Sequence, residues 1–126
     1  CVFDADVAVR NEAERKKLDN LFRKYGNKPS VVFCHSLPSV EYWFFLHFRN
    51  TNRAFRDADE AENELLGFIS NYEKSTKFLE DEKWVAGLCS NRKLDSAIER
   101  AGNFGETGQS YSNIYKAFEI FGYYKY

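Results

Sequence analysis

Residues 30–48 read SVVFCHSLPSVEYWFFLHF. The apolar run at residues 30–34 is typical of a strand that is covered on both faces of its sheet. Ser36 and Pro38 follow as helix-start residues, and apolar side chains then recur at helical spacing up to Phe48. The segment therefore predicts a buried strand that leads directly into an amphipathic helix.

The segment before it predicts a second strand–helix pair. Residues 1–5 read as a short buried strand, Asn11 and Glu14 form a helix capping pair, and Gly26 can end that helix in a left-handed conformation. Strand, helix, strand and helix in this order indicate a short parallel sheet with a right-handed βαβ crossover. Because the chain starts without Met and inside an apolar run, we expect an upstream strand and read the chain as the C-terminal part of a longer one.

After Arg49 the sequence predicts helices and no further strands. Asp57 with Glu60 is a capping pair, a later helix is closed by Gly102, and apolar residues near Phe118 indicate a last helix. We therefore predict one α/β domain over residues 1–126, with an α/β part at 1–49 and a mostly helical part at 50–126.

The composition limits the classes of function. The 126 residues are 44% hydrophobic, enough for one core, and the formal charge of −1 gives no global field that would attract a polyanion. Three cysteines cannot all pair and match no CxxC site, which favours a reducing compartment. Without a signal peptide or a long apolar segment, we expect a cytoplasmic protein that is not bound to a membrane. No glycine-rich nucleotide motif is present.

Asp4 and Asp6 are the best candidates for chemistry. Residues i and i+2 of a strand point to the same side, and the carboxyl end of a parallel strand is the usual ligand edge of an α/β fold. Two close carboxylates repel each other unless a cation lies between them, and Mg²⁺ suits such a pair. The alternative is a solvated acidic turn that caps the next helix.

The end of the second strand adds further candidates. A right-handed crossover brings both strand ends to one edge, so Ser36 and Glu41 are expected near the two aspartates as a substrate contact and a catalytic carboxylate. Glu41 has an alternative role as an acidic residue that satisfies the dipole of its own helix.

Three candidates follow in the helix and the loop after it. His47 lies on the apolar face of the helix, either as a hydrogen-bonded core histidine or as a general base. Arg49 and Arg53 are candidate phosphate contacts if their loop folds over the acidic edge, and otherwise belong to a solvated loop.

Residues 36–48 resemble the hallmark of the RloB-like proteins, roughly Ser-Asn-Pro-x-Phe-Glu-x-Trp-x-x-x-His-Phe. The matching positions are Ser36, Pro38, Glu41, Trp43, Leu46, His47 and Phe48. Leu37 and Val40 depart from the pattern. The aspartate-rich strand end at residues 3–6, the helix at 97–101 and the polar segment at 112–115 are also similar to that family.

The resemblance implies a TOPRIM-like fold and Mg²⁺-dependent (or Mn²⁺-dependent) cleavage of nucleic acid, in proteins associated with restriction loci and phage defence. On that basis Asp4 and Asp6 are expected to be metal ligands and Glu41 a third carboxylate. The family's upstream glutamate is absent, so the chain alone is expected to be nearly inactive. The contrasting hypothesis is a non-catalytic interaction module whose helical half contacts a partner ATPase.

Overall fold

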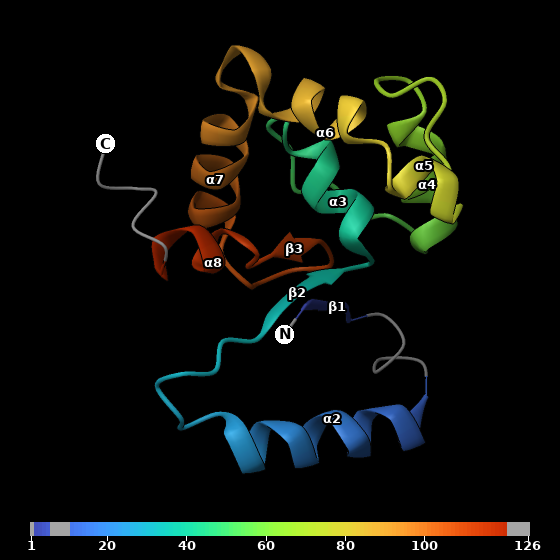
Figure 1. The fold of residues 1–126 in the computed structure, drawn as a ribbon. Coiled ribbons are helices and arrows are strands. Elements are labelled where there is room, and N and C mark those ends of the chain that lie inside the picture. Colours follow the sequence, from blue (N-terminus) through green and yellow to red (C-terminus); the bar gives the residue numbers. More distant parts are fainter. Residues whose placement is uncertain (1, 6–10, 121–126) are drawn as a thin grey trace.

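Three short strands lie between one long helix and a larger group of helices in the part of the chain that the structure describes (Figure 1). The structure is a computed structural model, and it describes residues 2–5 and 11–120. From the N-terminus its elements are β1 (Val2–Asp4), α2 (Glu12–Tyr25), β2 (Cys34–Leu37), α3 (Val40–Phe45), α4 (Ala58–Leu65), α5 (Thr76–Leu79), α6 (Glu82–Cys89), the 3₁₀ helix η1 (Ser90–Arg92), α7 (Lys93–Phe104), β3 (Tyr111–Ser112) and α8 (Tyr115–Ile120).

The sheet has the strand order β1-β2-β3 and mixes two kinds of pairing. β1 and β2 are parallel, with Asp4 opposite Ser36, and β2 and β3 are antiparallel, with Ser36 opposite Ser112. The α/β class is therefore confirmed, while the expected all-parallel sheet is corrected to a mixed one. β3 comes from the segment for which we predicted no strands. This prediction missed it because two residues, Tyr111 and Ser112, are too few to show the alternation that marks a strand.

β2 also begins later than predicted. We expected the strand at residues 30–34, but it runs over Cys34–Leu37, and its first residue is opposite Val2 of β1. The preceding apolar residues are used in packing: Val32 contacts the core, and the ring of Phe33 lies 4.5 Å from that of Phe22 in α2. The apolar run at residues 30–34 therefore indicates buried residues, whereas the strand itself begins at Cys34, where β1 lies alongside.

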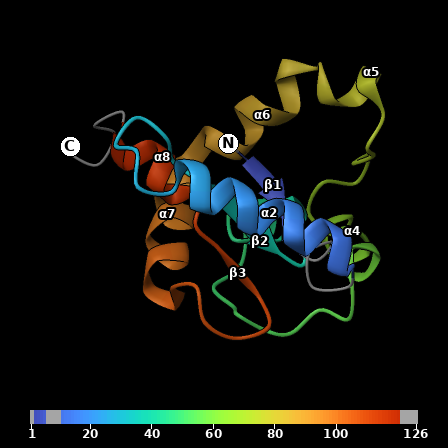
Figure 2. The same cartoon turned by 90° about the horizontal axis from the view of Figure 1, so that it is seen from below.

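The helix α2 covers one face of the sheet, and Figure 2 shows it crossing in front of β1 and β2. Its start is as predicted, since the Asn11 side chain accepts a hydrogen bond from the Glu14 N–H. The predicted left-handed end is wrong: Gly26 has a φ of −60°, and a Cβ there would lie 2.4 Å from the Phe22 carbonyl oxygen. No residue of α2 is fully buried, and its apolar residues Leu18, Phe22 and Tyr25 are half-buried.

The core lies on the opposite face of the sheet, around α3. Tyr42 and Leu46 are completely buried and Trp43 is nearly so, as its predicted place in the interior requires. α7 packs against this cluster through Ala97, Ile98 and Ala101. It continues past Gly102, where we predicted its end, and stops at Gly105, whose φ of +67° suits glycine.

Two further observations on the described residues concern the cysteines and the polarity of the helices. Cys34 and Cys89 are both free. Over residues 2–5 and 11–120, the helices are too short or too polar to cross a bilayer.

Candidate functional site

A row of polar side chains crosses the three strands. Asp4, Ser36 and Ser112 are opposite one another in register, so their side chains leave the same face of the sheet. The Ser36 hydroxyl donates to the Ser112 hydroxyl over 2.8 Å, and both serines are buried. Ser36 therefore joins two strands through its side chain, and its predicted role in binding a substrate has no exposed hydroxyl to support it.

Asp4 ends this row at the first turn of α3. One of its carboxylate oxygens, Oδ1, accepts a hydrogen bond from the Val40 backbone N–H at 2.7 Å. The neighbouring Ser39 is the N-cap residue, yet its own side chain makes no capping bond. A carboxylate from a distant strand thus takes the place of the local cap, and its charge lies at the positive end of the helix.

Glu41 lies in the same turn of α3 and is completely buried. The Ser39 hydroxyl donates to its Oε2 at 2.5 Å, the Tyr72 hydroxyl donates to Oε1 at 2.8 Å, and the Lys74 ammonium lies 3.0 Å from Oε1. Burial raises the pKa of Glu41, but these donors outweigh it and hold the pKa below the ordinary value. Glu41 is therefore an ionised, fully hydrogen-bonded carboxylate.

Tyr72 and Lys74 reach Glu41 from the connection between α4 and α5, which Figure 1 shows beside α3. Burial and the charge of Glu41 both raise the pKa of the Tyr72 hydroxyl. Burial lowers the pKa of Lys74, while its bond to Glu41 and the charges of Glu41 and Asp4 raise it to a net value above the ordinary one. Both groups therefore remain protonated donors, and Asp4 is close enough to act on each of them.

Asp6, the second predicted metal ligand, lies outside the described residues. Over residues 2–5 and 11–120, no three His, Cys, Asp or Glu side chains gather in a way that could hold a metal ion. Both oxygens of Glu41 accept bonds from proton donors, which does not fit a direct role as a metal ligand. Asp4 is half-buried at the strand end and fits Mg²⁺, which needs only one or two protein carboxylates.

His47 lies in the turn that follows α3 and is buried. Its Nδ1 is 3.0 Å from the Trp43 carbonyl oxygen, so Nδ1 carries the proton and donates it. Its ring meets the Trp43 ring edge-on. Burial lowers the pKa of His47 to about 4, which keeps the imidazole neutral. The geometry supports the core-histidine alternative, and the catalytic role of His47 stays a prediction.

Arg49 and Arg53 lie beyond the end of α3, whereas Asp4 contacts its first residue. The Arg49 guanidinium is 5.1 Å from the centre of the Phe68 ring. Arg53 pairs with Glu60 at 2.9 Å in the next helix. These contacts are with the helical half rather than with Asp4 or Glu41, and the phosphate-binding role of the two arginines stays a prediction.

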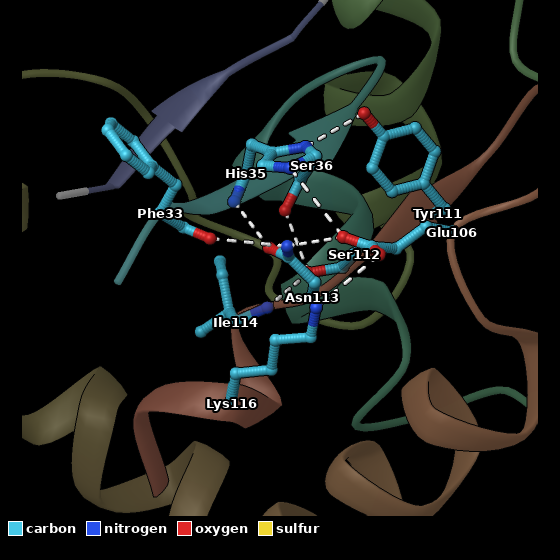
Figure 3. A network of polar contacts seen from close by, with 9 residues as sticks. All are labelled: Phe33, His35, Ser36, Glu106, Tyr111, Ser112, Asn113, Ile114 and Lys116. Carbon is cyan, nitrogen blue, oxygen red and sulfur yellow. Dashed lines mark hydrogen bonds and ion pairs between the residues drawn. The ribbon is translucent and has the colours of Figure 1, made fainter. Parts of the chain in front are cut away.

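A second polar network lies where β3 joins β2, and Figure 3 shows it from close by. The Asn113 side chain accepts a hydrogen bond from the His35 backbone N–H at 2.6 Å and donates one to the Phe33 carbonyl oxygen at 3.2 Å. The Asn113 backbone N–H also donates to the His35 carbonyl oxygen at 3.0 Å. Asn113 thus extends the pairing of β3 with the β2 region, through its backbone N–H and through its side chain.

Glu106 joins this network from the glycine-containing loop before β3. Its carboxylate accepts a hydrogen bond from Asn113 and lies 3.6 Å from Nε2 of His35 and 3.4 Å from the Lys116 ammonium. The Tyr111 hydroxyl is 2.8 Å from Nδ1 of His35. Burial lowers the pKa of His35, and Glu106 only partly opposes this effect. These contacts fix β3 against β2 and thereby the row that ends at Asp4.

Sequence reasoning missed Tyr72, Lys74, Glu106 and Tyr111, and named Asn113 only as part of a similar segment. Nothing in the sequence around Tyr72 indicated that its hydroxyl would meet Glu41. One signal was available: a buried carboxylate at position 41 requires proton donors from elsewhere in the chain.

The model of one protein family, described as RloB-like protein, matches residues 1–119. Comparison with curated proteins and with solved structures gave no match. The matched range includes the strand end with Asp4, the helix start with Glu41 and the connection that carries Lys74. The family match therefore spans the whole candidate site.

Proposed function

The chain belongs to the RloB-like family, and from this premise we propose that it is a Mg²⁺-dependent phosphodiesterase acting on nucleic acid. In this proposal β1 and β2 are part of a TOPRIM-like parallel arrangement, and the protein serves defence against phage or a restriction-associated system in the cytoplasm. Mn²⁺ is the expected substitute for Mg²⁺.

One observation carries the proposal: the Asp4 carboxylate lies at the carboxyl end of a strand with a parallel partner, fixed by the first N–H of α3. This edge is where α/β folds bind ligands. Asp4 and Asp6 would hold the ion, which when bound stabilises negative charge on phosphate oxygens and lowers the pKa of bound water. Glu41 is a positioning residue here, because it holds Tyr72 and Lys74 beside Asp4.

Metal binding is the first property to measure, because the resemblance also implies a glutamate ligand from an upstream strand. Melting temperature would be recorded while Mg²⁺ or Mn²⁺ is titrated into the chain. At about one hundred times its Kd, a ligand that binds only the folded state stabilises it by about 2.7 kcal/mol. The resulting shift is expected in the unmodified chain and should be lost in Asp4→Asn and Asp6→Asn.

Asp19→Asn is the matched control, since Asp19 is exposed on α2 and carries the same charge. It should keep the full shift. Cleavage of labelled DNA and RNA is the second readout, measured in a form that also carries the upstream glutamate implied by the resemblance, and it should depend on the same two aspartates. The proposal would be contradicted if the melting temperature of the unmodified chain did not change on addition of Mg²⁺ or Mn²⁺.

A non-catalytic interaction module is the second candidate function. It is favoured by large apolar side chains exposed in the helical half, namely Leu66, Leu79 and Val85. A partner ATPase is the expected binder. Metal-independent behaviour, together with loss of complex formation in Leu79→Asp, would favour this candidate over the phosphodiesterase.

A further inference from the structure

The connection between α4 and α5 places a cation directly at the acidic edge. Lys74 forms an ion pair with Glu41, with 3.0 Å between Nζ and Oε1. The two partners differ in exposure: the Glu41 side chain is 0% exposed, whereas that of Lys74 is 46% exposed. Lys74 therefore pairs with a buried carboxylate while nearly half of its own side chain stays accessible to solvent.

Lys74 retains the capacity to bind a second anion. An ammonium group has three N–H donors. Among the described residues, Glu41 is the one acceptor that the structure gives it. A phosphate oxygen could thus bind on the exposed side while the bond to Glu41 stays in place, so binding need not uncover a buried charge.

The charges of this edge favour a second cation where a polyanion approaches. Among the described residues, Asp4 and Glu41 are formally negative, and Lys74 is positive. A bound divalent ion would bring these formal charges to +1 with Lys74 and only to zero without it, so Lys74 supplies the net positive charge that attracts phosphate. The contacts of Arg49 and Arg53 are elsewhere: Arg53 pairs with Glu60 and Glu64, and the Arg49 guanidinium lies 5.1 Å from the centre of the Phe68 ring.

We propose that Lys74 binds a backbone phosphate of the nucleic acid at the edge formed by Asp4 and Glu41. This inference rests on the proposed function and adds a substrate-binding residue to it. The competing explanation is that Lys74 serves only as the counter-ion of Glu41. The two explanations differ in how nucleic-acid binding depends on salt.

The test measures the affinity of the chain for fluorescein-labelled duplex DNA and for single-stranded DNA and RNA, in Mg²⁺, over a series of NaCl concentrations. Each phosphate contact contributes about 0.9 to the slope of log K against log salt on duplex DNA and about 0.7 on single strands. Lys74→Gln should make the slope shallower by the amount expected for one phosphate contact, about 0.9 on duplex DNA, and Lys74→Arg should restore the original slope.

Lys77→Gln is the matched control, because Lys77 is an exposed lysine three positions further along the chain. It should leave the slope unchanged. An equal loss in both variants would assign the effect to overall charge and overturn the inference. A Lys74→Gln variant that melts earlier but keeps the full slope would also overturn it and leave the counter-ion explanation.

The outcomes separate this inference from the proposed function. If the unmodified chain binds no nucleic acid at any salt concentration, both fail. If it binds, and the form that carries the upstream glutamate cleaves in a metal-dependent way, while Lys74→Gln keeps the full slope, only the role of Lys74 fails. Binding with a Lys74-dependent slope but without metal-dependent hydrolysis would support the phosphate contact and remove the catalytic proposal.

Discussion

Asp4 and Val40 are 36 positions apart in the chain, yet a carboxylate oxygen of Asp4 lies 2.7 Å from the Val40 backbone nitrogen. This hydrogen bond ties the end of β1 to the start of α3. The residue that we propose as a metal ligand is therefore also a helix cap, and the two roles can be separated by substitution.

Asp4→Ala should lower the free energy of unfolding by about 0.5–2 kcal/mol, the usual cost of losing a capping side chain. Asp4→Asn keeps an oxygen that can accept the Val40 N–H bond, so it should stay closer to the unmodified chain in stability while losing metal binding. Urea unfolding with and without Mg²⁺ measures both effects. Equal stability of Asp4→Ala and the unmodified chain would show that the cap contributes nothing.

Glu41 should make stability depend on pH in the acidic range. Its folded pKa lies below the ordinary value of 4.5, so the ionised form stabilises the fold above that value. This contribution is lost as the pH falls from 4.5 through the lower folded pKa, because protonation then removes the charge that the donors bind. Glu41→Gln should reduce stability at neutral pH by about 1–3 kcal/mol and flatten this part of the profile.

The measurement is a series of urea unfolding curves at different pH values. Glu99→Gln is the control, since Glu99 is exposed on α7. It should leave the profile unaltered. A Glu41→Gln profile with the same acidic slope as the unmodified chain would contradict the assignment of that slope to Glu41.

His47 should stay neutral down to a pH far below that of an ordinary histidine. Its pKa is lowered from 6.5 to about 4, so the unfolded chain takes up a proton first as the pH falls. Stability from this group is complete above pH 6.5 and declines toward pH 4, by about 3 kcal/mol in total. NMR titration of the two imidazoles checks the value, and His47→Gln should remove this part of the pH dependence.

In a form that carries the upstream glutamate, metal-dependent cleavage should persist in His47→Gln, because His47 is bonded to Trp43 inside the core. Loss of cleavage at unchanged stability would restore the general-base role. A His47 resonance that titrates near 6.5 would contradict the burial on which the prediction depends.

Asn113→Asp should destabilise the junction of β3 and β2. The substitution removes the N–H donor to the Phe33 carbonyl oxygen and places a second carboxylate against Glu106. A buried acceptor without its donor costs about 1–3 kcal/mol, and the repulsion adds to this cost. Chemical denaturation measures the loss, with Asn20→Asp on the exposed side of α2 as the control. A near-neutral result would mean that the strands pair without the Asn113 side chain.

Local signals were enough to predict the helix starts. Asn11 caps Glu14 and Asp57 caps Glu60, as expected from their spacing of three residues. The burial of Trp43 likewise followed from helical periodicity. These features depend on neighbours within one turn, so the sequence alone contains them.

Contacts between distant segments could not be predicted in this way. Tyr72 meets Glu41 across 31 positions, and Asn113 meets His35 across 78. β3 is defined by pairing with β2 rather than by any pattern of its own. Glu41 was recognised as a candidate, but its donors, and with them its positioning role, depend on how the chain folds back.

The shallow burial of α2 has a consequence for local opening. None of its residues is buried, whereas α7 buries Ala97, Ile98 and Ala101. Segments with few buried apolar contacts open at a free energy well below that of global unfolding. Amide hydrogens of α2 should therefore exchange with deuterium long before those of α7, and each such opening uncovers one face of the sheet while the core around α3 stays closed.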